Sequence, residues 1–210
     1  MGKLGKACSL PGDLWEKWLR YVLEKLGPKM YVMLWMTQAL CLRITQVAQL
    51  RGKDFRFDTT EVWLKKFKKH KAIAKPLVPS VAKVIKKWQE SGLKTSLGTF
   101  AWDESSYLFP SRKGSKKPYV TKDFVCHKIA KVRKEFMQKH GIPKATKIKS
   151  HSGRRHSISA MALGGVPDHV GMAWAQISEH RVYKGYVDLD PRSAFASIRD
   201  FDKKARIGKQ

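Results

Sequence analysis

The chain has 210 residues and a mass of 24.0 kDa, which suits one domain with a sizeable hydrophobic core and would be cramped for two. Its 43 Lys and Arg against 17 Asp and Glu give a formal charge of +26, far more than solubility requires, and a polyphosphate backbone is the natural partner of such a surface. Acidic membrane lipid is the rival partner, but the basic residues are spread over the whole chain and not gathered beside one amphipathic anchor, which favours nucleic acid.

The cysteines and the apolar segments exclude several other classes. Cys8, Cys41 and Cys126 are odd in number and lack paired metal spacing, so they indicate neither a disulfide framework nor a zinc site. The most apolar run is too short to span a bilayer, and the N-terminus has no signal-peptide core. We therefore expect a soluble protein, not secreted, in the cytoplasm, nucleoid or nucleus, wherever its nucleic acid is.

The first third of the chain predicts a basic arm followed by two helices. Residues 1–12 carry lysines and glycines and are expected to be a loose arm, and residues 13–210 to form one domain. Apolar residues follow helical spacing over residues 13–26, and Gly27-Pro28 ends that helix. A second helix is expected over residues 29–50, and its first half is apolar nearly all round, as in the buried centre of a domain.

The remainder predicts a small sheet and further helices. Residues 55–79 alternate in the manner of short strands around a lysine-rich turn, and helices are expected over residues 80–90, 121–140, about 150–163 and about 193–204. Residues 92–117 are rich in Gly, Ser and Lys and are expected to be a long loop around one short buried piece at 107–110. The fold class is thus α+β, mainly α, with a small antiparallel sheet.

One short motif carries the chemistry. In the segment Ser150-His151-Ser152-Gly153-Arg154, a histidine and an arginine three residues apart fall on one face of a helical turn, so both can point at the same small anion. Arg43 lies at the end of a buried apolar run, where a guanidinium must be paired or must bind an anion. A tyrosine hydroxyl, from Tyr186, would complete a site for phosphoryl transfer.

An arginine, a hairpin lysine, His-x-x-Arg and a late tyrosine, in that order, resemble the catalytic domain of tyrosine recombinases, the phage-integrase-like enzymes. The resemblance runs from about Asp13 to the C-terminus and includes Arg-Ile-Thr-Gln-Val-x-x-Leu-x-x-x-Asp-Phe from Arg43 and a Leu-Phe-Pro landmark at residues 108–110. It implies a site-specific recombinase or integrase that cleaves and rejoins double-stranded DNA through a covalent 3′-phosphotyrosine. No nucleotide or metal cofactor is required, because the phosphotyrosine conserves the bond energy.

The resemblance also implies roles for individual residues. Arg43 and Arg154 would clamp the phosphate, and His151 would act as an acid, base or hydrogen-bond partner near the tyrosine. Lys71 is the first choice for the general acid by the family's spacing back from Val-Pro, with Lys69 next. Contacts to the DNA backbone are expected from five further positions, namely Lys68, Lys69, Lys128, Lys131 and Arg155.

Two tyrosines compete for the role of nucleophile. Tyr186 keeps the family's distance from the His-x-x-Arg arginine and is followed by Val-Asp-Leu-Asp-Pro, which resembles the segment after the family's nucleophile. The family has a histidine or tryptophan nine residues before that tyrosine, and counting back from Tyr186 gives Ile177, whereas counting back from Tyr183 gives Trp174. We favour Tyr186, with Tyr183 as the alternative and Trp174 and His180 as possible accessory residues.

Departures from the family keep other functions open. Gln46 stands where the family usually has a carboxylate. Together with Ile177, it leaves open the alternative that the chain is a catalytically inactive, recombinase-derived DNA-binding protein. A type IB topoisomerase-like enzyme is a further alternative, disfavoured by His151. The residues before Asp13 are too few for the family's N-terminal clamping domain, so we expect modest DNA affinity. The resemblance implies a homo-oligomer, a tetramer on DNA, formed through the C-terminal segment.

Overall fold

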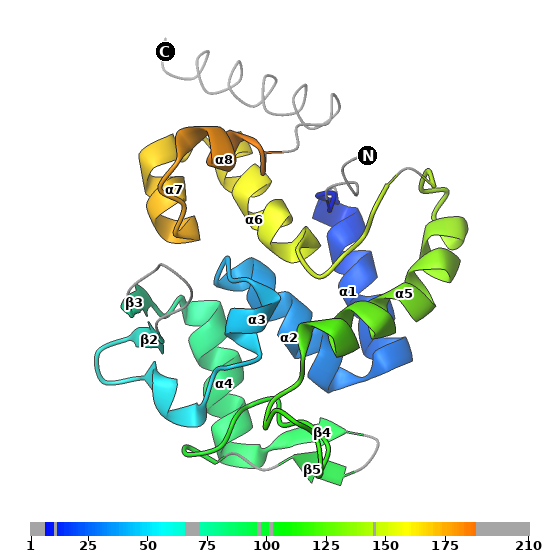
Figure 1. Ribbon diagram of the computed structural model, residues 1–210. Coiled ribbons are helices and arrows are strands. Elements are labelled where there is room, and N and C mark those ends of the chain that lie inside the picture. The colour runs from blue at the N-terminus through cyan, green and yellow to red at the C-terminus, as the bar shows by residue number, and fades with distance from the viewer. Residues whose placement is uncertain are drawn as a thin grey trace, which may run out of the picture.

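The computed structural model describes residues 7–10, 12–65, 72–95, 98–100, 103–144 and 146–187. Within these ranges the protein is mainly helical, with one three-stranded antiparallel sheet and one two-stranded hairpin (Figure 1). The predicted fold class, α+β and mainly α, is therefore confirmed. No helix in the described part of the chain is long and apolar enough to cross a membrane.

The order of the elements follows the predicted order closely. The helices are α1 (Gly12–Leu26), α2 (Pro28–Ala39), α3 (Ile44–Val47), α4 (Pro79–Ser91), α5 (Lys122–Lys139), α6 (Ser152–Leu163), α7 (Asp168–Ala175) and α8 (His180–Lys184), with a 3₁₀ turn η1 (Gly52–Asp54). The strands are β1 (Phe55–Arg56), β2 (Glu61–Leu64), β3 (Ile73–Pro76), β4 (Leu93–Thr95) and β5 (Gly98–Phe100). The predicted C-terminal helix near residues 193–204 lies outside the described residues.

Helix α2 is the centre of the domain, as its nearly uniform apolar character predicts. It packs against α1 on one side and α6 on another, and α1 also packs on α5 (Figure 1). Half of its residues are buried, including Met33, Leu34 and Met36, and the others are partly buried. The chain turns sharply between α1 and α2 at Gly27, whose φ of 82° favours glycine, and Pro28 then starts α2 at a position where proline is tolerated.

The prediction of a single helix over residues 29–50 is wrong, because the helix is interrupted just before Arg43. Helix α2 ends at Ala39, and Cys41 adopts a left-handed conformation with φ of 51°. Leu40, Cys41 and Leu42, at and after this break, are all buried. Arg43 consequently lies in the loop and caps the N-terminus of the short helix α3.

The long loop predicted over residues 92–117 also needs correction, because β4 and β5 form an antiparallel hairpin at its start. Hydrogen bonding within a short hairpin satisfies the backbone even in a Gly- and Ser-rich segment. The short buried piece is confirmed: Leu108 and Phe109 are 2% and 0% exposed, and bridges link Tyr107 to Arg51 and Pro110 to Tyr119.

Helix α5 buries Val125, Ile129 and Phe136, whereas the ring of Phe124 is 41% exposed. Thr121 caps the helix by accepting a hydrogen bond from the Phe124 backbone N–H. One consequence is an exposed aromatic ring under the ammonium group of Lys128, 5.5 Å from the ring centroid.

Part of the N-terminal arm lies against the domain. The Cys8 N–H donates to the Lys147 carbonyl at 3.1 Å, and Leu10 is only 2% exposed. The Leu10 carbonyl lies 2.9 Å from Nδ1 of His156, whose ring stacks on Trp15. Residues 7–10 therefore run beside the segment that leads into α6, and residues 1–6 are outside the described ranges.

Gly153 allows α6 to approach α2 closely enough to build the site. A Cβ atom at this position would meet Oγ1 of Thr37 at 2.2 Å and the Trp15 ring at 3.0 Å. Because Thr37 is fully buried, we expect Gly153→Ala to lower the free energy of unfolding by about 1–3 kcal/mol through overpacking. Chemical denaturation of both proteins measures this difference.

A double-mutant cycle identifies the cause. Thr37→Ala removes the hydroxyl that the new methyl group would strike, so the loss caused by Gly153→Ala should be smaller in the Thr37→Ala background. An equal loss in both backgrounds would show that the contact between these two residues does not limit the packing of α6 on α2.

Candidate functional site

Arg43 stands in the loop between α2 and α3 with its guanidinium half-buried. Its backbone N–H donates to Oε1 of Gln46 at 3.0 Å, which closes the first turn of α3, and Nε2 of Gln46 donates to the side-chain carbonyl of Gln176 at 3.1 Å. Gln46, at the position where a carboxylate was expected, thus joins the Arg43 loop to the end of α7. Nη1 of Arg43 is buried and has no hydrogen-bond partner among the described residues.

The electrostatics around Arg43 indicate an anion site. Burial, and next the positive charge of Arg154, lower the pKa of Arg43, while Tyr186 acts in the opposite direction. Two guanidinium groups that repel each other, each with a buried N–H group that has no partner among the described residues, are arranged to receive a negatively charged ligand.

Arg154 is 0% exposed and lies at the heart of the site. Its Nη1 donates to the Cys41 carbonyl and its Nη2 to the Ala175 carbonyl, each at 2.5 Å. A guanidinium has five N–H groups, so these two bonds leave three, including the buried Nε–H, which has no partner among the described residues. The arginine joins the loop before Arg43 to the end of α7 and retains donors for a further acceptor.

His151 caps the N-terminus of α6 and lines an open pocket of about 920 Å³. Burial, followed by the charges of Lys122 and Arg154, lowers the pKa of His151 to about 4. At neutral pH its imidazole is therefore uncharged and keeps one nitrogen lone pair. Nδ1 lies 3.5 Å from the Ser150 hydroxyl, which is also 3.5 Å from the sulfur of Cys126, so one ring nitrogen is turned toward α5.

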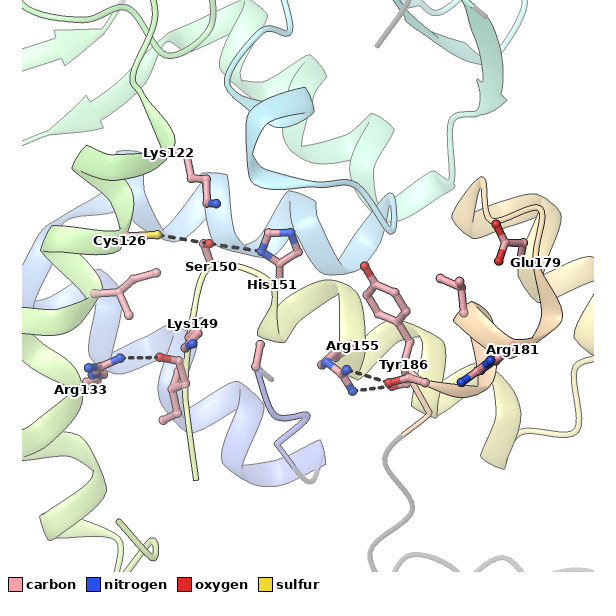
Figure 2. A pocket seen from close by; sticks show the side chains of 15 residues that line it. Lys122, Cys126, Arg133, Lys149, Ser150, His151, Arg155, Glu179, Arg181 and Tyr186 are labelled. Atoms are coloured by element: carbon pink, nitrogen blue, oxygen red, sulfur yellow. Dashed lines mark hydrogen bonds between the residues drawn. The ribbon is translucent and has the colours of Figure 1, made fainter. Parts of the chain in front are cut away.

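Tyr186 faces the same pocket from the opposite side. Figure 2 shows its ring projecting into the pocket from just beyond α8, while the His151 ring enters from the start of α6. The Tyr186 ring centroid lies 5.4 Å from Cζ of Arg154 and 5.0 Å from Cζ of Arg155. The half-buried ring of Tyr186 thus lies close to the guanidinium groups of two consecutive arginines.

Arg155 holds the backbone at Tyr186. Its Nη2 donates to the Gly185 carbonyl at 2.7 Å and its Nη1 to the Tyr186 carbonyl at 3.2 Å, and the side chain is 6% exposed. The prediction for this residue was a contact to the DNA backbone. Its guanidinium is instead occupied in fixing the segment that carries Tyr186.

Tyr183 is part of the core. It is 0% exposed, and its hydroxyl has no hydrogen-bond partner among the described residues. The ring packs on Gly171, where a Cβ atom would meet the tyrosine oxygen at 2.1 Å. Of the two tyrosines that the sequence left in competition, only Tyr186 reaches the pocket.

The two possible accessory residues lie elsewhere. The imidazole of His180 is exposed and pairs with the Asp168 carboxylate at 2.7 Å, which also pairs with Lys184 at 2.8 Å. Trp174 lies at the end of α7, and its ring contacts the ammonium group of Lys75 at 4.1 Å from the centroid. Ile177, at the family's histidine or tryptophan position, is a buried core residue at 7% exposure.

The predicted hairpin lysines Lys68, Lys69 and Lys71 fall in residues 66–71, outside the described residues. Lys128 and Lys131 lie on α5, and Lys131 is exposed. Lys128 lines a second groove, of about 850 Å³, between α2, α5 and the loop at 110–121. Lys122 lines both this groove and the Tyr186 pocket, so basic side chains continue from one to the other.

Sequence reasoning missed Lys75. It is 3% exposed, lies on β3 and donates from Nζ to the carbonyls of Leu40 and Trp174. Burial lowers the pKa of Lys75 to about 7. The signal was available in the strand alternation: Lys75 lies opposite Val62, which is fully buried, and residues directly opposite in an antiparallel pair share one face.

No group of three or more His, Cys, Asp or Glu residues with metal-ligand geometry occurs among the described residues. The basic and acid–base groups that lie near Tyr186 include the side chains of Lys122, His151 and Arg154. Such a set supports charge stabilisation and proton transfer around a phosphate.

Comparison with known proteins identifies the family. Residues 18–188 match the sequence model of the phage integrase family. This chain belongs to the phage integrase family. The match includes Arg43, the His151-x-x-Arg154 motif and Tyr186, and it confirms the resemblance on which the sequence interpretation rested. No curated protein matches the chain.

Solved structures of one integrase and two recombinases share the fold. The Tn1549 transposon integrase in complex with a circular intermediate DNA is 15% identical, with a TM-score of 0.69 over 95% of this chain and 68% of that one. XerA recombinase is 14% identical, with a TM-score of 0.65 over 98% and 66%. XerH site-specific recombinase bound to a palindromic difH substrate is 15% identical, with a TM-score of 0.60 over 96% and 53%. This chain thus spans about half to two thirds of the length of these proteins.

Proposed function

We propose that this chain is the catalytic part of a DNA recombinase or integrase, and that it cleaves and rejoins DNA strands through a covalent bond to Tyr186. The observation that carries the proposal is the position of the Tyr186 ring, which lies against Arg154 and in one pocket with His151, whereas Tyr183 is buried. The structural relatives that hold DNA support a DNA substrate, as does the formal charge of +26.

The proposed reaction needs no energy source. The Tyr186 oxygen attacks the phosphorus of a phosphodiester, the bond to the 5′-oxygen breaks, and a 3′-phosphotyrosine and a free 5′-hydroxyl result. Attack by a 5′-hydroxyl on the phosphotyrosine reverses these changes and releases the tyrosine. Because one phosphate ester replaces another at each step, no water is consumed.

Each charged group then has a distinct task. Arg43, with an unpaired N–H group, and Arg154, with three donors left, would bind the non-bridging oxygens as charge develops on them. His151, uncharged at neutral pH, would accept a hydrogen bond or the proton of the Tyr186 hydroxyl. Lys71, or next Lys69, would protonate the departing 5′-oxygen.

The direct test uses duplexes with a nick beside the cleavage position, so that a short 5′-hydroxyl fragment diffuses away and the covalent complex accumulates. The proposal predicts a protein–DNA species that survives denaturing electrophoresis. A protein that binds the same duplex tightly and forms no such species would be a recombinase-derived binding protein, the alternative that Ile177 and Gln46 leave open. Relaxation of supercoiled DNA without strand exchange would instead favour topoisomerase-like activity.

The basic groove predicts how binding responds to salt. Lys122 connects the Tyr186 pocket with the second groove, and we expect it to contact a DNA phosphate. Lys122→Ala should therefore reduce the slope of log affinity against log salt by about one, because each phosphate contact releases counterions. Binding to a random duplex over a salt series measures the slope.

A matched control lies at the other end of the same helix. Lys139 is exposed and is 17 residues away on α5, or about 25 Å along the helix axis. Lys139→Ala removes the same charge and should leave the slope near the wild-type value. Equal slopes for both variants would contradict a backbone contact at Lys122.

A further inference from the structure

Two helix ends meet behind the proposed phosphate site. Helix α2 ends at Ala39 and α7 ends at Ala175, and each is followed closely by a residue in the left-handed conformation, Cys41 with φ of 51° and Gln176 with φ of 52°. The last carbonyl groups of a helix have no partner within it and carry the negative end of the helix dipole. Placed face to face, these two ends require cations or other donors between them.

Two cations fill that space in parallel. Nζ of Lys75 donates to the Leu40 carbonyl at 2.6 Å and to the Trp174 carbonyl at 2.5 Å. Arg154 spans the carbonyls of the next residue on each side, Cys41 and Ala175. Each cation thus joins one carbonyl from the end of α2 to one from the end of α7.

The setting of Lys75 is built for an ammonium group. Its side chain leaves the inward face of β3, and Nζ lies 4.1 Å from the centroid of the Trp174 ring, which attracts a cation. An ammonium group has three donors, and two backbone carbonyls and an aromatic face use them. The side chain is 3% exposed, so these contacts lie inside the protein.

We propose that Lys75 is a positioning residue of the site. It fixes the end of α2 against the end of α7 and thereby sets the relative positions of Arg43, three residues after Leu40, and of Tyr186, on the segment that follows α7. Lys75 does not contact the substrate in this role. Its effect on catalysis rests on the proposed function, while its effect on the two helix ends does not.

The test uses Lys75→Met, which keeps the length of the side chain and removes its donors. Hydrogen exchange is followed at the backbone amides that are hydrogen-bonded at the two helix ends, namely those of Leu40, Cys41, Gln176 and Ile177. We expect their exchange to accelerate about tenfold, with amides of α1 and α5 unchanged, because the opening is local. Unchanged exchange at both ends, or equal acceleration throughout the domain, would overturn the proposal.

Two functional readouts separate positioning from loss of fold. Lys75→Met should bind duplex DNA within about twofold of wild type, since binding depends on exposed phosphate contacts. The rate of covalent complex formation on nicked duplexes should fall roughly a hundredfold, because small displacements of catalytic groups are costly. A rate equal to that of the wild type would show that the two helix ends do not set the geometry of the site.

Further variants keep the proposal falsifiable. Lys139→Met removes an exposed lysine and should change neither exchange nor rate. If Lys75→Met does not fold, Lys75→Arg decides the matter, because it retains the charge but its longer guanidinium does not fit the buried position of Nζ, and amide exchange should rise at the two helix ends alone. If wild-type protein forms no covalent complex, the proposed function fails, while the exchange result still decides the role of Lys75.

Discussion

Replacing Tyr186 by phenylalanine should abolish the covalent complex with nicked DNA while leaving duplex affinity near the wild-type value. The variant loses only the hydroxyl group that forms the bond to phosphorus, and its ring can still pack against Arg154 and Arg155. The expected loss is complete within detection, because the covalent bond to phosphorus is made by the hydroxyl group that the variant lacks. Denaturing electrophoresis of end-labelled duplexes measures the complex, and titration of the same duplexes measures affinity.

Tyr183→Phe is the matched control. The Tyr183 hydroxyl is buried and lacks a partner among the described residues, so its removal deletes an unsatisfied polar group and should not destabilise the fold. This variant should form the covalent complex. The opposite pattern, with Tyr183→Phe inactive and Tyr186→Phe active, would reverse the assignment.

Arg43→Ala should slow covalent complex formation by roughly 10²–10³-fold and leave duplex binding much less affected, because its donors matter most when charge develops on the phosphate oxygens. Arg43→Lys should not restore the rate, since a single ammonium group cannot reproduce the guanidinium fork. Single-turnover rates on nicked duplexes and duplex affinities provide the comparison.

Stability distinguishes the two arginines. Nη1 of Arg43 has no partner among the described residues, so Arg43→Ala should leave the unfolding midpoint nearly unchanged. Arg154→Ala removes the partner of two buried carbonyl groups and should destabilise the domain as well as inactivate it. If Arg43→Ala unfolds the domain, or if cleavage continues at the wild-type rate, Arg43 is a structural residue and not part of the phosphate clamp.

The order of the helices and strands was predictable, because the spacing of the apolar residues indicates which residues face the core. The pattern of apolar residues located α1, α2 and α4, and the alternation in residues 55–79 located the sheet. The break at Cys41 was not predictable, because a left-handed cysteine has no local sequence signal and is imposed by tertiary packing. That break decides where Arg43 lies.

Spacing alone could not separate the two tyrosines, because each kept one family distance. The burial of each side chain separates the two tyrosines. Tyr183 is buried because Gly171, which is distant in the sequence, leaves room for its ring in the core. Arg155 and Lys75 show the same limit. In the sequence both residues resemble the many exposed lysines and arginines. In the structure each is buried and donates hydrogen bonds to backbone carbonyls that come together only when the chain folds.

The most direct test of the central claim is to map the tyrosine that carries the nucleotide in the trapped wild-type complex. Trypsin separates the two candidates, because cleavage after Arg181, Lys184 and Arg192 places Tyr183 in peptide 182–184 and Tyr186 in peptide 185–192. After nuclease digestion, mass spectrometry should find the nucleotide on peptide 185–192 and at Tyr186. A nucleotide on peptide 182–184, or on neither peptide, would contradict the account.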